Sequence, residues 1–270
     1  MTLRQTVGLV GAGAVSRSPV ARLLPGALGP VMADSYRLAS RLVSSLRAGY
    51  PVRDWDELRR SRTILIVAPD STVPELVRRI AAAPVEWSRR VFLLCDSAQT
   101  SAVLTPLAAR GAFTGSSAAL PGFEPACFLV EGDREALRAA RRLIGNPTQA
   151  IEVRREAKTR LLAAYAIAGS LFIPLAAVVQ SCVRAAGLRG EPANTLVERV
   201  FTRALRTFLK SGRQCWTGPR PAPDAAEVAR LLAVLQEIDP KLAGFFRGSI
   251  VNALELFDRD ASGLGLPRQL

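Results

Sequence analysis

The sequence predicts an α/β domain with a doubly wound parallel sheet of the Rossmann type, followed by an all-α domain. An apolar run at residues 7–10 leads directly into a glycine turn, Gly11-Ala12-Gly13, as at the start of a dinucleotide-binding βαβ unit. Continuous apolar runs at 63–68 and 91–95 alternate with helical stretches, which is typical of strands buried on both faces of a sheet. From Arg154 onward apolar residues recur at helical spacing. We therefore expect a dinucleotide-binding domain at 1–153 and a helical domain at 154–270.

Composition narrows the classes of function. The 270 residues are 49% hydrophobic, enough for packed cores, and carry 36 Lys+Arg against 23 Asp+Glu, a net charge of +13. The arginines are scattered, which argues against a nucleic-acid footprint, although anions such as nucleotides would still be attracted. The four cysteines lie far apart and the chain has no histidine. We therefore expect no metal site and a reduced, cytoplasmic protein.

The remaining elements follow from local patterns. In the first domain we expect strands at 29–33, 112–114, 126–130 and 150–153, helices at 36–46 and 133–144, and a loop at 115–125. Serine and proline at 18 and 19 indicate that the first helix begins late, which would displace the amides meant for a pyrophosphate. In the second domain we expect helices at 155–186, 196–209, 224–235 and 239–254, with loops at 187–194 and 217–223. Asp224 and Glu227 resemble a capping box.

Several residues are placed to bind a dinucleotide at the carboxyl ends of the strands. The glycine turn supplies Gly11, Ala12, Gly13, Ala14 and Val15, and the ends of later strands supply Ala68, Pro69 and Ser97. Asp34 follows the second strand and could accept hydrogen bonds from a ribose diol, which favours NAD; its alternative role is the N-cap of the next helix. Ser35 lies beside it, and Arg37 could instead meet the 2′-phosphate of NADP.

Residues 161–183 contain no charge and are long enough to span a bilayer. Gly169, Ser170 and Pro174 interrupt this stretch, which lies in mid-chain. We therefore expect a central helix buried on most sides by its neighbours. A membrane span is the less favoured alternative.

Five motifs support a resemblance to a known family: Val-Gly-Leu-Val-Gly-Ala-Gly at 7–13, Val-Ala-Pro-Asp at 67–70, Ala-Arg-Gly-Ala at 109–112, Phe-Leu-Val-Glu-Gly-Asp at 128–133, and Lys158 at the start of the long helix. With them the chain resembles Rossmann-like proteins with a helical C-terminal domain of unknown function. These belong to the 6-phosphogluconate dehydrogenase C-terminal-like superfamily and are generally assigned as NAD(P)-dependent oxidoreductases. The resemblance covers nearly the whole chain. It implies hydride transfer on a small substrate held between the domains, and a homodimer formed through the C-terminal helices.

The sequence departs from that family where proton transfer is expected. The family's histidines are replaced by Cys95, by Ala118-Ala119 and by Leu161-Leu162, an asparagine is replaced by Ser170, and the third glycine of the turn is Ser16. Hydride transfer to a carbonyl or imine needs a proton donor or an oxyanion-stabilising group.

The remaining candidates for that role are Lys158, Ser170 and Ser117, followed by Ser97 and Ser116. Lys158 leads because desolvation would lower its pKa, although a lysine among charged neighbours also suits a solvated helix start. Cys95 is a weaker candidate because a cysteine that ends an apolar strand is usually buried and inert.

Two hypotheses remain open. In the first, the chain is an oxidoreductase that uses NAD or NADP on an unidentified small substrate. In the second, it is a catalytically degenerate relative, with or without a cofactor, that acts as a nucleotide-binding, metabolite-binding or protein-interaction scaffold.

Overall fold

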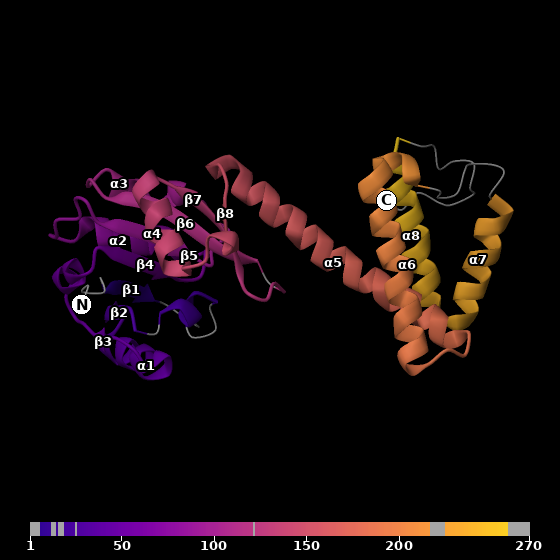
Figure 1. Cartoon of the computed structure of the whole chain (residues 1–270), viewed down its shortest axis with the longest axis horizontal. Helices are drawn as coiled ribbons and strands as arrows, with labels where there is room; N and C mark the ends of the chain where they lie inside the picture. Colours follow the sequence, from indigo (N-terminus) through magenta and orange to yellow (C-terminus); the bar gives the residue numbers. More distant parts are fainter. Residues whose placement is uncertain are drawn as a thin grey trace. The chain divides into compact units, whose positions relative to one another are not determined.

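The computed structural model describes residues 6–11, 15, 19–24, 26–120, 122–216 and 225–258. The chain divides into two compact units, Met1–Ala166 and Ile167–Leu270. The division falls inside the long helix α5 (Arg155–Ala185), whose first turns belong to the first unit. Figure 1 shows the order of the elements along the chain.

The first unit is built on one eight-stranded sheet with the strand order β3-β2-β1-β4-β5-β6-β7-β8. Its strands are β1 (Val7–Gly11), β2 (Leu28–Met32), β3 (Tyr50–Pro51), β4 (Thr63–Val67), β5 (Val91–Cys95), β6 (Phe113–Leu120), β7 (Cys127–Gly132) and β8 (Ala150–Glu152). Neighbouring strands are parallel except for the antiparallel pair β6 and β7. The predicted doubly wound sheet is confirmed, and β3 is an addition to it.

Helices cover both faces of this sheet. They are η2 (Pro19–Leu23), α1 (Tyr36–Leu46), η3 (Trp55–Arg60), α2 (Val73–Ala82), η4 (Ser101–Leu104), α3 (Thr105–Ala108), α4 (Arg134–Ile144) and η5 (Pro147–Gln149). Because side chains alternate along a strand, Leu65 and Leu93 join the core under α1 and α4, whereas Ile66 and Leu94 join the core under α2 and α3. Strands β4 and β5 are therefore buried on both sides, which explains their unbroken apolar sequences.

The segment after β1 departs from the usual βαβ pattern. A 3-10 helix, η2, begins at Pro19, and the described residues between β1 and β2 contain no α-helix. The expected start of the first helix near Ser18 stays a prediction. Residues 12–14 and 16–18 lie outside the described part. At α1 the N-cap is Ser35, whose Oγ accepts a hydrogen bond from Leu38 N at 3.2 Å. Asp34 is therefore not the cap, and that alternative is wrong.

The loop predicted at 115–125 is wrong over its first half, because β6 continues to Leu120. The antiparallel ladder with β7 runs from Gly115 opposite Gly132 to Leu120 opposite Cys127. Glycine, serine and alanine have low intrinsic preference for strands, so the local sequence suggested a loop. Backbone pairing with a strand that follows later in the chain decides the conformation instead.

The second unit is helical, as predicted. It holds most of α5 together with α6 (Gly190–Ser211), η6 (Gly212–Cys215), α7 (Ala225–Ile238) and α8 (Pro240–Leu256). The loop expected at 187–194 ends early, because α6 already begins at Gly190. Asp239 caps α8 by accepting a hydrogen bond from Lys241 N at 2.8 Å. The predicted capping residue Asp224 lies outside the described residues.

The expected burial of α5 is wrong for the single chain. None of its most apolar window is buried, and Leu171 and Ile173 are 61% and 65% exposed. With a mean hydropathy of 2.1 in that window, α5 is long and apolar enough to cross a membrane. Within the second unit, α5, α7 and α8 leave an apolar groove of about 650 Å³ lined by residues such as Val179, Val183, Leu231, Leu235 and Phe246. The sequence pattern predicted the presence of α5 correctly, but it did not predict that its apolar residues are exposed in the single chain.

The glycine pair in the β6–β7 ladder yields a stability prediction. Gly132 has φ +136°, and a Cβ there would overlap Gly115 Cα and Thr114 O. We expect Gly132→Ala to lower the free energy of unfolding by about 3 kcal/mol or more, measured by urea denaturation with tryptophan fluorescence. Gly145 is the matched control: it also has positive φ, +79°, but no atom lies within 4 Å of its added Cβ. Gly145→Ala should cost about 1 kcal/mol, and equal losses in the two variants would contradict the steric argument.

Candidate functional site

The predicted cofactor residues lie where parallel strands end at one edge of the sheet. Gly11 ends β1 opposite Val67 of β4, and the ladder continues through β5 to Cys95 opposite Ser117 of β6. Asp34, Ala68, Pro69 and Ser97 follow the ends of β2, β4 and β5 directly. Open α/β sheets bind ligands at this edge.

The described part of the glycine turn is tightly packed. A Cβ on Gly11 would lie 2.9 Å from Val15 Cγ2 and 3.0 Å from Leu42 Cδ1. Val15 is buried and belongs to the core cluster beneath α1. Glycine at position 11 is therefore required by packing as well as suited to a ligand. Ala12, Gly13 and Ala14 lie outside the described residues.

The end of β2 carries one carboxylate among several arginines. Asp34 Oδ1 accepts a hydrogen bond from Arg79 Nη1 at 3.1 Å, in an exposed ion pair. Arg37 lies exposed in the first turn of α1. The guanidinium of Arg53 lies 4.4 Å from the ring centroid of Tyr36, in a cation–π contact. The charge of Asp34 is thus offset locally, and the surroundings suit an anion.

Asp70 joins the loops that follow β4 and β5. Ser97 Oγ donates to Asp70 Oδ1 at 2.5 Å, and Ala98 N donates to Asp70 Oδ2 at 3.2 Å. Gln99 Nε2 donates to the Asp70 carbonyl at 2.5 Å. The Ser97 hydroxyl is therefore engaged in a hydrogen bond within the protein. Ala68 and Pro69 lead into the loop at Asp70, which these hydrogen bonds join to residues 97–99.

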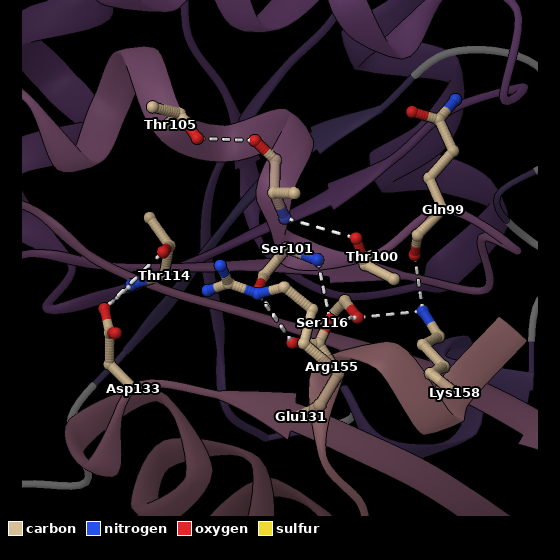
Figure 2. A network of polar contacts seen from close by, with 11 residues as sticks. Gln99, Thr100, Ser101, Thr105, Thr114, Ser116, Glu131, Asp133, Arg155 and Lys158 are labelled. Carbon is tan, nitrogen blue, oxygen red and sulfur yellow. Dashed lines mark hydrogen bonds and ion pairs between the residues drawn. The ribbon is translucent and has the colours of Figure 1, made fainter.

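Lys158 lies at the centre of a buried polar network, shown in Figure 2. Its Nζ donates three hydrogen bonds: to Ser97 O at 2.9 Å, to Gln99 O at 2.6 Å and to Ser116 Oγ at 2.8 Å. The side chain is 0% exposed. The alternative that Lys158 is a solvated lysine at a helix start is wrong. All three protons of the ammonium group are used within the first unit.

The negative charge in this network is Glu131, which is 1% exposed. Its carboxylate accepts hydrogen bonds from Ser101 N at 2.6 Å, from Ser101 Oγ at 2.7 Å and from Ser116 Oγ. Arg155 Nε lies 3.7 Å from Glu131 Oε2 and donates to Ser101 Oγ at 3.1 Å. Ser116 and Glu131 stand directly opposite each other in the β6–β7 ladder, so the strand register itself brings them together.

Burial changes the ionisation of two groups here. Desolvation lowers the pKa of Lys158, and the negative charge of Glu131 is the largest influence that opposes this shift. Burial is also the main cause that raises the pKa of the Cys95 thiol, and Asp96 adds to the effect. Cys95 is thus a neutral thiol at neutral pH, which does not suit a nucleophile.

The predicted catalytic candidates Lys158, Ser117 and Ser170 have different surroundings. Ser116, one residue before Ser117, is the serine that contacts Lys158. Since successive side chains in a strand point to opposite faces, Ser117 faces away from this contact. Ser170 belongs to the second unit, where it is exposed and its Oγ donates to Ile167 O at 3.3 Å.

Sequence reasoning assigned no role to Glu131, Ser101, Arg155 or Asp70, although Asp70 and Glu131 lie within two of the motifs that support the resemblance. For Glu131 the sequence offers one indication. It directly follows the apolar run of residues 128–130, and a carboxylate in a buried strand needs hydrogen-bond donors around it. The others left none, since their roles depend on contacts between residues distant in sequence.

Comparisons with known proteins agree with this architecture. Residues 126–249 match the family model described as a domain of unknown function, DUF2520. The resemblance inferred from the sequence is confirmed over those residues. A comparison with curated proteins finds no match.

Among solved structures, the chain is similar to an imine reductase from Bacillus cereus, with TM-score 0.64 and 14% identity over 95% of this chain and 100% of that one. It is also similar to an imine reductase from Myxococcus stipitatus in complex with NADP+, with TM-score 0.62 and 19% identity over 93% and 94%. An imine reductase from Aspergillus terreus gives TM-score 0.65 and 17% identity over 97% and 99%. These likenesses establish the fold, a Rossmann-type domain followed by a helical C-terminal region.

The raised pKa of Cys95 leads to a prediction about reactivity. Because alkylation requires the thiolate, we expect iodoacetamide at pH 8 to leave Cys95 unmodified in the folded protein and to label it after unfolding. Cys215, which is partly exposed, is the internal control and should react in the folded protein. Peptide mapping by mass spectrometry measures both sites. Equal labelling of Cys95 and Cys215 before unfolding would show that Cys95 is accessible and ionised.

Proposed function

We propose that the chain binds a nicotinamide dinucleotide at the carboxyl edge of its parallel strands and transfers hydride between that cofactor and a small carbonyl or imine compound. The observation that carries the proposal is Lys158, a buried cation at the edge where this fold binds its ligands. The likeness to an imine reductase in complex with NADP+ supports the choice of cofactor class.

The proposed roles follow from the chemistry of hydride transfer, which leaves charge on a carbonyl oxygen or an imine nitrogen. Lys158 is the proposed proton donor. Its bond to Gln99 O is part-buried, whereas its bonds to Ser97 O and Ser116 Oγ are buried. A substrate atom would take the place of the Gln99 carbonyl at Nζ. Ser117 and Ser170 remain secondary candidates as hydroxyl donors to the substrate.

A catalytically degenerate scaffold is the second candidate function, and two observations favour it. The chain contains no histidine, so the usual proton-transfer groups of the related proteins are missing. The described residues between β1 and β2 contain 3-10 helix and no α-helix, whereas a pyrophosphate in this fold binds at the N-terminus of an α-helix. Such a protein would keep the fold and bind a nucleotide, a metabolite or a protein partner without turnover.

Titration with NADPH and NADH, followed by tryptophan and nicotinamide fluorescence, tests cofactor binding and its preference. We propose a preference for NADPH, because Arg79 offsets the charge of Asp34 and Arg37 lies nearby. Asp34→Ala removes a carboxylate that would repel a 2′-phosphate, so the Kd for NADPH should fall about fivefold and that for NADH should rise. Asp56→Ala, which removes an exposed aspartate paired with Arg59, is the control and should change neither. Tighter binding of NADH than of NADPH by the wild-type protein would contradict the preference.

Two further outcomes decide between the candidate functions. Micromolar binding that Gly13→Asp abolishes, with NADPH oxidation in a panel of carbonyl and imine compounds that Lys158→Met abolishes, supports the oxidoreductase. Binding without oxidation of NADPH by any compound favours the scaffold. Failure of the wild-type protein to bind either cofactor at millimolar concentration would refute the proposed function.

We also propose that the protein is a homodimer through its C-terminal helices. The apolar exposed residues of α5 include Ile167, Leu171, Phe172 and Ile173, and the apolar groove among α5, α7 and α8 is open. An exposed apolar surface of this kind is typical of an interface. A second copy of the same chain is the partner that the related helical domains suggest.

Light scattering after size exclusion, without detergent, tests the dimer. The wild-type protein should have twice the 28.9 kDa mass of one chain. Ile173→Glu places a charge in the exposed apolar surface and should weaken the dimer at least tenfold. Leu38→Glu, at an exposed leucine of α1 in the first unit, is the matched control and should remain dimeric. A monomeric wild-type protein would overturn the proposal, and a requirement for detergent would favour the membrane-span alternative for α5.

A further inference from the structure

We infer that Glu131, acting through the hydroxyl of Ser116, keeps Lys158 positively charged and holds its ammonium group in place at the carboxyl edge of the sheet. Glu131 and Ser116 are thus positioning residues for the lysine. The inference deepens the proposed function, on which the catalytic meaning of Lys158 rests. The charge relation itself depends only on the contacts within the first unit.

The directions of the hydrogen bonds carry the argument. Ser116 Oγ accepts from Lys158 Nζ at 2.8 Å, so its own proton is left to donate to Glu131 Oε1. Ser101 repeats this arrangement on the other oxygen: its Oγ accepts from Arg155 Nε at 3.1 Å and donates to Glu131 Oε2 at 2.7 Å. Two cations therefore reach one carboxylate, each through a serine. The Ser101 backbone N–H, which can only donate, completes the set.

Every partner of Glu131 is a donor, so the carboxylate satisfies this network only in its ionised form. Lys158 shows the converse. Its three partners are two backbone carbonyls and a hydroxyl that is already donating elsewhere, so all three require a proton from Nζ. A neutral amine has only two protons and would leave one of these buried acceptors without a donor.

Burial alone favours the neutral amine of Lys158 and lowers its pKa, because the charged form loses its hydration. Three groups besides Glu131 bear on its charge, namely Asp70, Asp96 and Cys95 from the β4 and β5 ends. Arg155 of α5 faces Glu131 from the other side, with its Nε 3.7 Å from Glu131 Oε2. Asp70 already accepts from Ser97 and Ala98, and Cys95 is held neutral. Glu131 is the acid that is joined to Lys158 through a single hydroxyl. Removal of its charge should therefore favour the neutral amine.

The chain is well suited to a direct test, because it has only three lysines: Lys158, Lys210 and Lys241. Lysine labelled with ¹⁵N gives three side-chain signals, which Lys210→Arg and Lys241→Arg assign by loss of a peak. The ¹⁵Nζ shift followed against pH reports protonation of each lysine in the full-length protein. In the wild-type protein we expect Lys158 to titrate below the ordinary pKa of a lysine.

Glu131→Gln keeps the shape of the side chain and removes its charge. We expect the midpoint of Lys158 to fall by about one pH unit or more, a tenfold change in its protonation equilibrium. Ser116→Ala removes the bridging hydroxyl and should lower the same midpoint by a smaller amount. Glu135→Gln is the charge-matched control, because Glu135 pairs with Arg62 and Arg138 on the surface of α4, and it should leave Lys158 unchanged. A purely structural role of Glu131 would lower stability without moving this midpoint.

An unchanged Lys158 midpoint in Glu131→Gln would overturn the inference. If Glu131→Gln does not fold, as judged by circular dichroism, Ser116→Ala decides alone: a lowered midpoint supports the inference and an unchanged one overturns it. NADPH titration of the same samples separates the two proposals. A wild-type protein that binds no cofactor refutes the proposed function and leaves the titration of Lys158 as it stands.

Discussion

The other polar contacts of the candidate site depend on the burial of the Glu131 carboxylate, which requires hydrogen-bond donors and positive charge around it. The antiparallel ladder of β6 and β7 puts Glu131 opposite Ser116, and the close approach of Gly115 and Gly132 one position along holds that register. An ionised carboxylate in such a place is strongly unfavourable unless donors surround it. The protein supplies Ser116 and Ser101 at hydrogen-bond distance and two cations behind them. The sheet thus places the carboxylate and the bridging Ser116, and the first turn of α5 supplies the two cations.

This arrangement also explains why α5 is divided between the two units. Its first turn carries Arg155, which contacts Ser101 of η4 and Glu131 of β7, and Lys158, which contacts the loop after β5 and Ser116 of β6. Beyond Ala166 the helix is almost wholly apolar and belongs to the second unit. One helix thus has a polar end that polar contacts hold and an apolar remainder that only burial against another surface can stabilise. Different interactions therefore stabilise the two parts of α5. The change is visible in the sequence, because residues 161–183 contain no charge.

The sequence predicted what depends on local patterns. Unbroken apolar runs identified β4 and β5, and the change from strand to helical spacing near Arg154 placed the helical region. It did not predict β6 beyond Thr114, because Gly115, Ser116 and Ser117 form a strand only through pairing with β7. The same pairing decides which serine meets Lys158. The burial of that lysine and its link to Glu131 depend on contacts across the sheet, for which a single sequence gives no periodic signal.

The two candidate functions make different demands on one hydrogen bond, the one that Lys158 Nζ donates to the Gln99 carbonyl. In a scaffold, the three bonds of Lys158 Nζ are its whole role: they fix α5 to the loop after β5, and nothing has to exchange. In an oxidoreductase, the bond to the Gln99 carbonyl, the part-buried one of the three, must give way to a substrate atom. The other two would then keep the ammonium group aimed at the sheet edge. Glu131 serves both functions, because a lysine that is to donate a proton must first be kept protonated in a place that disfavours its charge. In a chain without histidine, the proposed catalysis by Lys158 would therefore depend on Glu131 and Ser116 to keep the lysine protonated.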